Sequence, residues 1–116
     1  MTTPDPNRLD RLDGVHPDLD AAMRAIVSEC GDLGLTLVLT QGLRSTEQQI
    51  MLYACGRTRA GKIVTMADGL KKASMHQRQA DGWGHAVDVA WRTGGIIDWV
   101  GPWDTLGELA RTHGLV

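Results

Sequence analysis

The chain has no phenylalanine and only one tyrosine, and its four tryptophans all lie between Trp83 and Trp103. Its aromatic mass is therefore confined to the C-terminal third. Large apolar side chains dominate small cores, so we expect most of these tryptophans to be core residues rather than a substrate platform. The two cysteines, Cys30 and Cys55, have no Cys-x-x-Cys spacing and are too few for a disulfide framework. We interpret them as buried free thiols.

Neither sign of charge dominates the sequence. The 116 residues carry a formal net charge of −2 with the signs interspersed, which argues against a nucleic-acid face and a polybasic membrane-binding segment. No apolar run reaches the length of a signal-peptide core or of a bilayer span. We therefore expect one soluble domain over 1–116, synthesised in the cytoplasm without a signal peptide and monomeric, with no nucleic-acid or membrane partner. A chain of this length buries about two-thirds of the surface that it exposes when unfolded.

Local patterns predict alternating helices and strands after a loose arm over 2–13. Pro17 and the acids near it favour a helix start, Ser45 with Gln48 forms a capping-box pattern, and Gly94-Gly95 is typical of a hairpin turn. The expected helices open at 15–18 and close at 31–34, run over 45–56, and run from 101–104 to 114; the expected strands are 35–40, 87–91 and 96–99. The predicted fold is α+β, with helices packed on a small, mostly antiparallel sheet.

Ligand-capable side chains gather in residues 74–90, which contain His76, Asp81, His85 and Asp88. If 85–91 form a strand, Asp88 lies on the face opposite His85, between two alanines. A carboxylate buried there needs a cation, a hydrogen-bond donor or solvent, and we propose His76 as its neighbour. A catalytic zinc takes three protein ligands, usually imidazole, carboxylate or thiolate, and His76 with Asp88 would supply two of them. Asp88 as a turn cap or arginine partner, and His76 as a surface loop residue, remain the alternatives.

Arg44 is expected at a corner where the strand over 35–40 leads into the helix that begins at Ser45. Loops held by a rigid scaffold often carry function, and a guanidinium matches a carboxylate or a developing oxyanion. We therefore select Arg44 as a substrate-side candidate, with a simply solvated arginine as the alternative. His16, beside a proline, and His113, on the last helix, are interpreted as structural. The basic loop over 56–62 is interpreted as a solvated face.

Two short motifs stand out, Gly-x-Arg-Ser at 42–45 and Gly-x-Ala-x-Asp at 84–88. Together with residues 15–19, 40–45 with Gln49, 52–58, 61–65 and 74–76, they carry a resemblance that is spread along nearly the whole chain in family order. The chain resembles the zinc D,D-peptidases with the Hedgehog-like fold, which include VanY-type D-Ala-D-Ala carboxypeptidases and phage L-alanyl-D-glutamate endopeptidases.

The resemblance implies His76 and Asp88 as zinc ligands and Arg44 as the side chain that contacts a substrate carboxylate or the transition-state oxyanion. The separation of His76 from Asp88 exceeds the family's usual spacing, which leaves Asp81 as a competitor, although Asp81-Gly82 is typical of a turn. The family continues into a strand and a loop with an acidic general base and a third ligand, a histidine. We expect residues 1–116 to be a peptidase domain that lacks this C-terminal segment.

The function implied by the resemblance is zinc-dependent hydrolysis of a stem-peptide bond in peptidoglycan, as an endolysin-type L-Ala-D-Glu endopeptidase of phage that degrades the cell wall. A D-Ala-D-Ala carboxypeptidase is the alternative within hydrolases. A non-catalytic wall-binding module that kept the fold is the alternative from another class. In the enzyme, zinc and Arg44 would stabilise the negative charge that develops on a peptide carbonyl.

Overall fold

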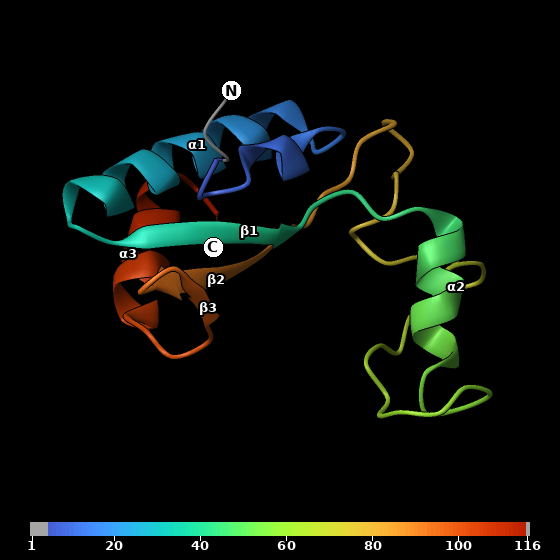
Figure 1. Cartoon of the computed structure of the whole chain (residues 1–116). Helices are drawn as coiled ribbons and strands as arrows, with labels where there is room; N and C mark the ends of the chain where they lie inside the picture. Colours follow the sequence, from blue (N-terminus) through green and yellow to red (C-terminus); the bar gives the residue numbers. More distant parts are fainter. Residues whose placement is uncertain (1–4, 116) are drawn as a thin grey trace, which may run out of the picture.

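The computed structural model describes residues 5–115. Figure 1 shows a three-stranded sheet with α1 and α3 beside it, and α2 farther away. The predicted α+β class is confirmed. The elements in chain order are the 3₁₀ helix η1 (Leu9–Leu12), α1 (Pro17–Asp32), β1 (Thr36–Gln41), α2 (Thr46–Ala54), β2 (Asp88–Thr93), β3 (Ile96–Asp98) and α3 (Trp103–Thr112).

The sheet has the order β1-β2-β3 and is antiparallel throughout. Gly94 and Gly95, both with positive φ, form the turn between β2 and β3, which confirms the predicted hairpin. β1 pairs with β2 so that Gln41 lies opposite Asp88, after a register shift between Leu39 and Gln41. The end of β1 therefore meets the start of β2, and these two strand ends hold the candidate site.

The apolar core lies between α1, α3 and one face of the sheet. Leu37 and Leu39 of β1 are fully buried, and they face Trp91 and Val89 across the ladder. Alternate residues of a strand share a face, so these side chains meet the apolar stripe of α1. The buried cluster consists of Leu12, Met23, Ile26, Val27, Cys30, Leu37, Leu39 and Trp91, and Leu106, Leu109 and Ala110 of α3 pack against it.

The prediction of a loose N-terminal arm is wrong for residues 9–12, which form η1 and bury Leu12 in the core. Asn7 also accepts a hydrogen bond from the Leu39 amide and donates its side-chain amide to the Leu37 carbonyl. The segment before η1 thus covers the outer edge of β1, where unpaired backbone groups would otherwise remain. Residues 2–4 of the predicted arm lie outside the described residues.

The tryptophan prediction is also wrong, because only Trp91 is buried. Trp83, Trp99 and Trp103 are 39%, 62% and 38% exposed. Both cysteines are free, as predicted, but Cys55 is only half-buried. None of the helices within residues 5–115 is long and apolar enough to cross a membrane.

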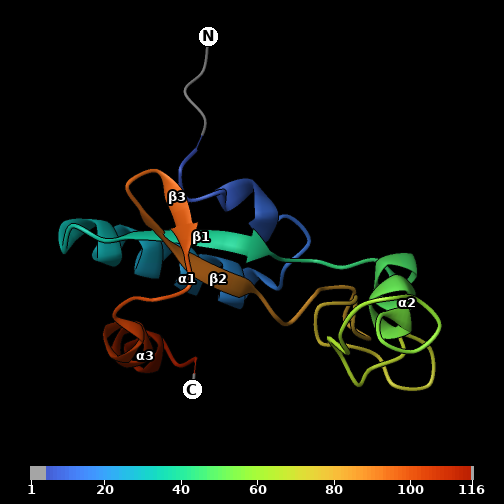
Figure 2. The same cartoon turned by 60° about the horizontal axis from the view of Figure 1, so that its bottom comes forward.

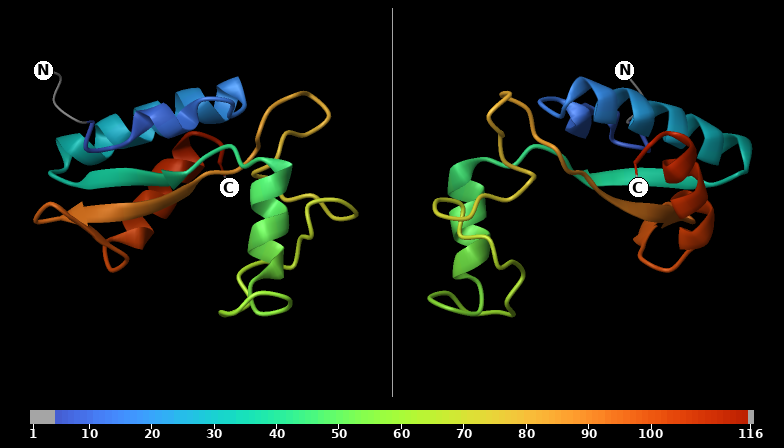
Figure 3. Two further views of the ribbon diagram at one scale, coloured as in Figure 1. Left: turned by 45° about the vertical axis from the view of Figure 1, so that its right-hand side comes forward. Right: turned by 180° about the vertical axis from the view of Figure 1, so that it is seen from behind.

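Helix α2 and the irregular segment from 55 to 87 form a part of the molecule that lies away from the sheet (Figures 2 and 3). Two buried glutamines organise it. Gln49 donates to the Thr65 hydroxyl and the Ala67 carbonyl, and Gln77 donates to the Gly69 carbonyl. Hydrogen bonds from side-chain amides to loop carbonyls therefore stabilise this part of the molecule, whereas apolar packing stabilises the part around the sheet.

Candidate metal and substrate site

The candidate site is built where β1 leads into α2 and where residues 76–88 lead into β2. Ser45 caps α2 by accepting the Gln48 amide, and Gln48 accepts the Ser45 amide in return, which confirms the predicted capping box. This cap fixes the direction in which the chain leaves Arg44. The Arg44 amide also donates to the His76 carbonyl at 2.7 Å, and this bond joins the two segments.

His76 is held with one ring nitrogen toward the protein and the other toward Asp88. Its Nδ1 lies 2.9 Å from the Gly42 carbonyl oxygen, which can only accept, so Nδ1 carries a proton. Its Nε2 lies 3.4 Å from Asp88 Oδ1. A histidine whose Nδ1–H is bound by a carbonyl presents Nε2 as its metal-binding atom. The structure therefore brings the two predicted ligands together.

Arg44 is buried and lies on the other side of the Asp88 carboxylate. Its Nη1 donates to Gln49 Oε1 at 2.6 Å and its Nη2 to Gln41 Oε1 at 2.7 Å. Nη2 is also 3.8 Å from Asp88 Oδ2. The two glutamines fix the plane of the guanidinium, and Asp88 has a cationic neighbour on each side whenever His76 is protonated.

Burial differs sharply among the three side chains. Arg44 and His76 are 9% and 12% exposed, whereas the Asp88 side chain is 52% exposed. The strand pattern predicts that a carboxylate here needs a cation, a hydrogen-bond donor or solvent beside it. Asp88 is the first residue of β2, and its carboxylate has solvent on one side and Arg44 and His76 on the other.

The electrostatics of the three groups are coupled. The Asp88 carboxylate, helped by the Gly42 carbonyl, raises the pKa of His76 above its ordinary value against the effect of burial. His76, with the Arg44 charge, lowers the pKa of Asp88, again against burial. Burial lowers the pKa of Arg44, which Asp88 partly offsets. A protonated imidazole cannot bind a metal, so protons compete with a metal ion for His76.

The other ligand-capable residues of the segment form a separate pair. His85 Nε2 lies 2.7 Å from Asp81 Oδ2, and the His16 ring meets the His85 ring edge-on with 5.3 Å between centroids. Asp81 precedes Gly82 in a turn, as predicted. Asp81 therefore pairs with His85, while Asp88 keeps His76.

His113 is placed as the sequence interpretation predicted. It ends α3 and its Nε2 lies 2.7 Å from Glu29 Oε1 of α1. This contact joins two helices of the core.

Within residues 5–115, no group of three or more histidine, cysteine, aspartate or glutamate side chains is arranged to hold a metal ion. His76 and Asp88 are thus a donor pair of the right chemistry, one ligand short of the set that a catalytic zinc takes from its protein.

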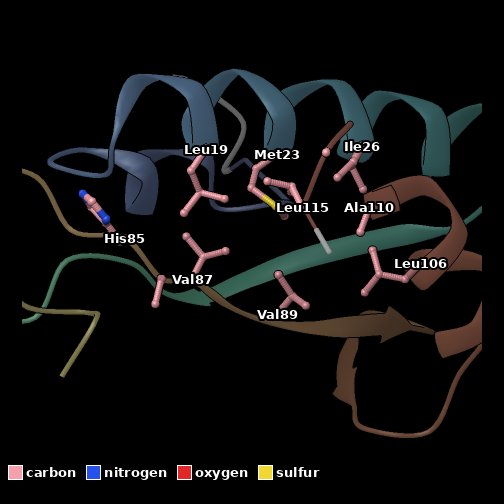
Figure 4. Close-up of a pocket in the computed structure, with 11 residues that line it drawn as sticks. Leu19, Met23, Ile26, His85, Val87, Val89, Leu106, Ala110 and Leu115 are labelled. Carbon is pink, nitrogen blue, oxygen red and sulfur yellow. The ribbon is translucent and has the colours of Figure 1, made fainter. Parts of the chain in front are cut away.

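A hollow of about 450 Å³, separate from the candidate site, lies between α1, α3 and the face of the sheet that they cover (Figure 4). Its walls are aliphatic, with Leu19 and Met23 facing Val87 and Val89, and His85 lies at one end. His85, Val87 and Val89 therefore share a face, as the strand alternation predicted. Apart from His85 its lining side chains are apolar, so no other ligand-capable side chain lies in it.

Comparison with known proteins supports a peptidase family in general. The chain is similar to a peptidoglycan endopeptidase. It is 34% identical over 111 residues to peptidoglycan L-alanyl-D-glutamate endopeptidase CwlK of Bacillus subtilis (strain 168), an alignment that covers 86% of this chain and 62% of that protein. The chain thus spans a little under two-thirds of the length of this relative. No family model matches the chain.

Sequence reasoning placed Gln41, Gly42 and Gln49 within the matched motifs but missed their role as polar supports of the site. Gln41 and Gln49 hold Arg44, and the Gly42 carbonyl holds His76. Gln49 had a usable signal, since it lies on α2 one turn after the Ser45 cap and is the buried residue of that helix. The role of the Gly42 carbonyl has no signal in a single sequence, because every residue has a carbonyl.

Proposed function

We propose that the chain is a zinc-dependent peptidoglycan peptidase that hydrolyses the L-Ala-D-Glu bond of the stem peptide. The observation that carries this proposal is the convergence of Arg44, His76 and Asp88 at the meeting point of β1 and β2. The similarity to a peptidoglycan L-alanyl-D-glutamate endopeptidase supports both the substrate class and the bond.

In this chain, His76 Nε2 and the Asp88 carboxylate would hold the zinc ion. The tautomer imposed by the Gly42 carbonyl and the solvent-facing carboxylate both fit that role. When bound, zinc would supply Lewis-acid chemistry and a water that is acidic enough to ionise near neutral pH.

Arg44 would act on the substrate side of the site. Gln41 and Gln49 orient its guanidinium before any substrate arrives, and a preorganised donor of this kind stabilises negative charge as it develops on a carbonyl oxygen. Asp88 lies 3.8 Å from the same guanidinium, so the arginine also helps to keep the carboxylate ionised. Arg44 therefore links metal binding to charge stabilisation.

The proposed activity is tested by incubating the chain with zinc and a defined disaccharide stem peptide, and identifying the products by mass spectrometry. The proposal expects a new amino terminus at D-Glu that disappears in Arg44→Ala. Release of a terminal D-Ala would instead identify a D,D-carboxypeptidase. Tight binding to peptidoglycan without any new terminus would identify a wall-binding module and refute the proposed hydrolysis.

A further inference from the structure

The loop that follows α2 has a local excess of positive charge. Arg57, Arg59 and Lys62 are the only charged residues between Glu47 and Asp68 in the sequence. Within residues 5–115, no carboxylate lies within ion-pair distance of any of these three cations. The small negative net charge of the whole chain hides this excess, because acidic residues outnumber basic ones elsewhere. The loop is therefore a local source of positive potential.

The same loop exposes three large apolar side chains. Ile63, Val64 and Met66 are 58%, 59% and 70% exposed. Thr65, which lies among them, points inward, and its hydroxyl accepts a hydrogen bond from the buried Gln49 at 3.2 Å. The loop is thus anchored to the helix while its apolar side chains face solvent. Exposed apolar groups beside charged residues commonly mark an interaction surface.

Contacts within the loop place the cations and the apolar side chains together. Arg57 Nη2 lies 3.5 Å from the Met66 sulfur. The Gly56 amide donates to the Arg59 carbonyl at 3.0 Å. Gly56 also approaches the backbone of Ile63 so closely that an added Cβ would lie 2.7 Å from the Ile63 nitrogen. Figures 1 and 3 show this loop beyond the C-terminal end of α2, at the opposite end of the helix from β1.

We propose that this loop docks the protein on an anionic lipid bilayer, with Arg59 and Lys62 at the headgroups and Val64 and Met66 in the interfacial region. A soluble anionic polymer would satisfy the cations but leave the apolar side chains in water. The surface of an anionic bilayer takes both kinds of group from one loop, since phosphates lie next to the ends of the acyl chains. Peripheral docking of this kind needs no membrane-spanning helix.

The candidate site lies at the other end of the helix. Helix α2 has nine residues and so is about 13 Å long. Arg44 precedes its N-terminus, whereas the docking loop follows its C-terminus. A bilayer bound at the loop would therefore leave the candidate site about one helix length away.

Binding is measured by co-sedimentation of the 116-residue chain at low salt with vesicles of phosphatidylcholine alone or mixed with phosphatidylglycerol. The anionic vesicles are expected to bind about 100-fold more strongly, because each of three cations near an anionic surface contributes about fivefold. The double variant Arg59→Gln, Lys62→Gln should lose about 25-fold in binding. Val64→Ser should lose about fivefold, since a half-inserted valine contributes part of its transfer from water.

A fluorescence measurement tests insertion separately from charge. Val64→Trp places a fluorophore at the exposed tip of the loop. Its emission, after subtraction of that of the four native tryptophans measured in the parent, should shift to the blue on anionic vesicles and be quenched by brominated lipid.

Two control variants make the same changes elsewhere. The double variant Arg24→Gln, Arg111→Gln removes the same charge from exposed positions of α1 and α3, and should bind within about twofold of the parent because screening limits the range of each charge. Leu33→Ser removes a side chain that is 60% exposed at the end of α1, and should bind as the parent does. An amide NMR spectrum of each variant establishes that it is folded.

Equal binding of the parent to both kinds of vesicle, no binding to either, or equal losses in the two double variants would each overturn the inference. Polyphosphate bound with the same dependence on Arg59 and Lys62, together with an unshifted Val64→Trp emission, would identify a site for soluble anionic polymers and would also overturn it. The experiment contains neither zinc nor peptidoglycan, so its outcome is independent of the proposed hydrolysis.

Discussion

Gln49 supports Arg44 from inside the protein, and replacing it with alanine should be costly. The residue is fully buried on α2. Its Oε1 accepts from Arg44 Nη1 at 2.6 Å, and its Nε2 donates to the Ala67 carbonyl at 2.7 Å. Gln49→Ala leaves a buried charged donor and a half-buried carbonyl without these partners.

The magnitude follows from those two groups. An orphaned charged donor costs about 1.5–3 kcal/mol and an orphaned carbonyl about 1–3 kcal/mol, so we expect a loss of about 2.5–6 kcal/mol in the free energy of unfolding. With a urea m-value of about 1.5 kcal/mol/M, the unfolding midpoint should fall by about 2–4 M. Circular dichroism in a urea titration measures this shift.

Gln48→Ala is the control, because it makes the same change one position earlier on the exposed side of α2. It removes only the return bond of the capping box and should cost about 1 kcal/mol. Equal costs for the two variants would refute the reasoning that Gln49 satisfies buried groups around Arg44.

Two further predictions concern the same corner of the molecule. The metal-free chain should show a pH-dependent stability from the His76–Asp88 pair: because the pKa of His76 is raised, its contribution is complete below the ordinary histidine pKa of about 6.5 and is lost as the pH rises through the folded-state value. Because the pKa of Asp88 is lowered, its contribution holds above about pH 3.9 and is lost as the pH falls through the folded-state value. Urea unfolding in EDTA from pH 3 to 9 measures both, and an Asp88→Asn variant with an unchanged loss above pH 6.5 would contradict the assignment. Gly42→Ala should destabilise the chain by about 3 kcal/mol or more, since a Cβ there collides with the Arg11 carbonyl, a backbone atom that cannot move aside. Gly31→Ala, which meets nothing on the surface of α1, should be neutral or stabilising, and similar urea midpoints for the two glycine variants would rule out the collision.

Local signals in the sequence predicted most of the secondary structure. Pro17 fixes φ for a helix start, Ser45 supplies a capping hydroxyl, and Gly94-Gly95 tolerates the positive φ of a turn. The structure confirms all three. The prediction of a loose arm failed at η1 for a different reason. Leu12 is drawn into the core by contacts with residues far along the chain, and a short polar segment carries no periodic pattern that announces this.

The sequence was enough to select the candidate site residues, but not to identify the hydrogen-bond partners that hold them in place. His76, Asp88 and Arg44 were selected because their types and motifs indicate metal and anion chemistry. The structure brings His76 and Arg44, from sequence-distant segments, each within 4 Å of the Asp88 carboxylate. The division of four ligand-capable residues into His76–Asp88 and His85–Asp81 depends on how residues 77–83 fold back. That path is set by tertiary hydrogen bonds, such as Gln77 to the Gly69 carbonyl, which spacing does not reveal.

The most direct test of the account is the zinc content of the purified 116-residue chain after dialysis against a weak chelator, beside that of His76→Ala and Asp88→Ala. The account predicts about one zinc per chain in the parent and its loss in both variants, because the two side chains are the donor pair that the structure brings together. His85→Ala is the matched control and should retain the metal, since His85 pairs with Asp81. Zinc that remains bound in both His76→Ala and Asp88→Ala would contradict the assignment of the metal site.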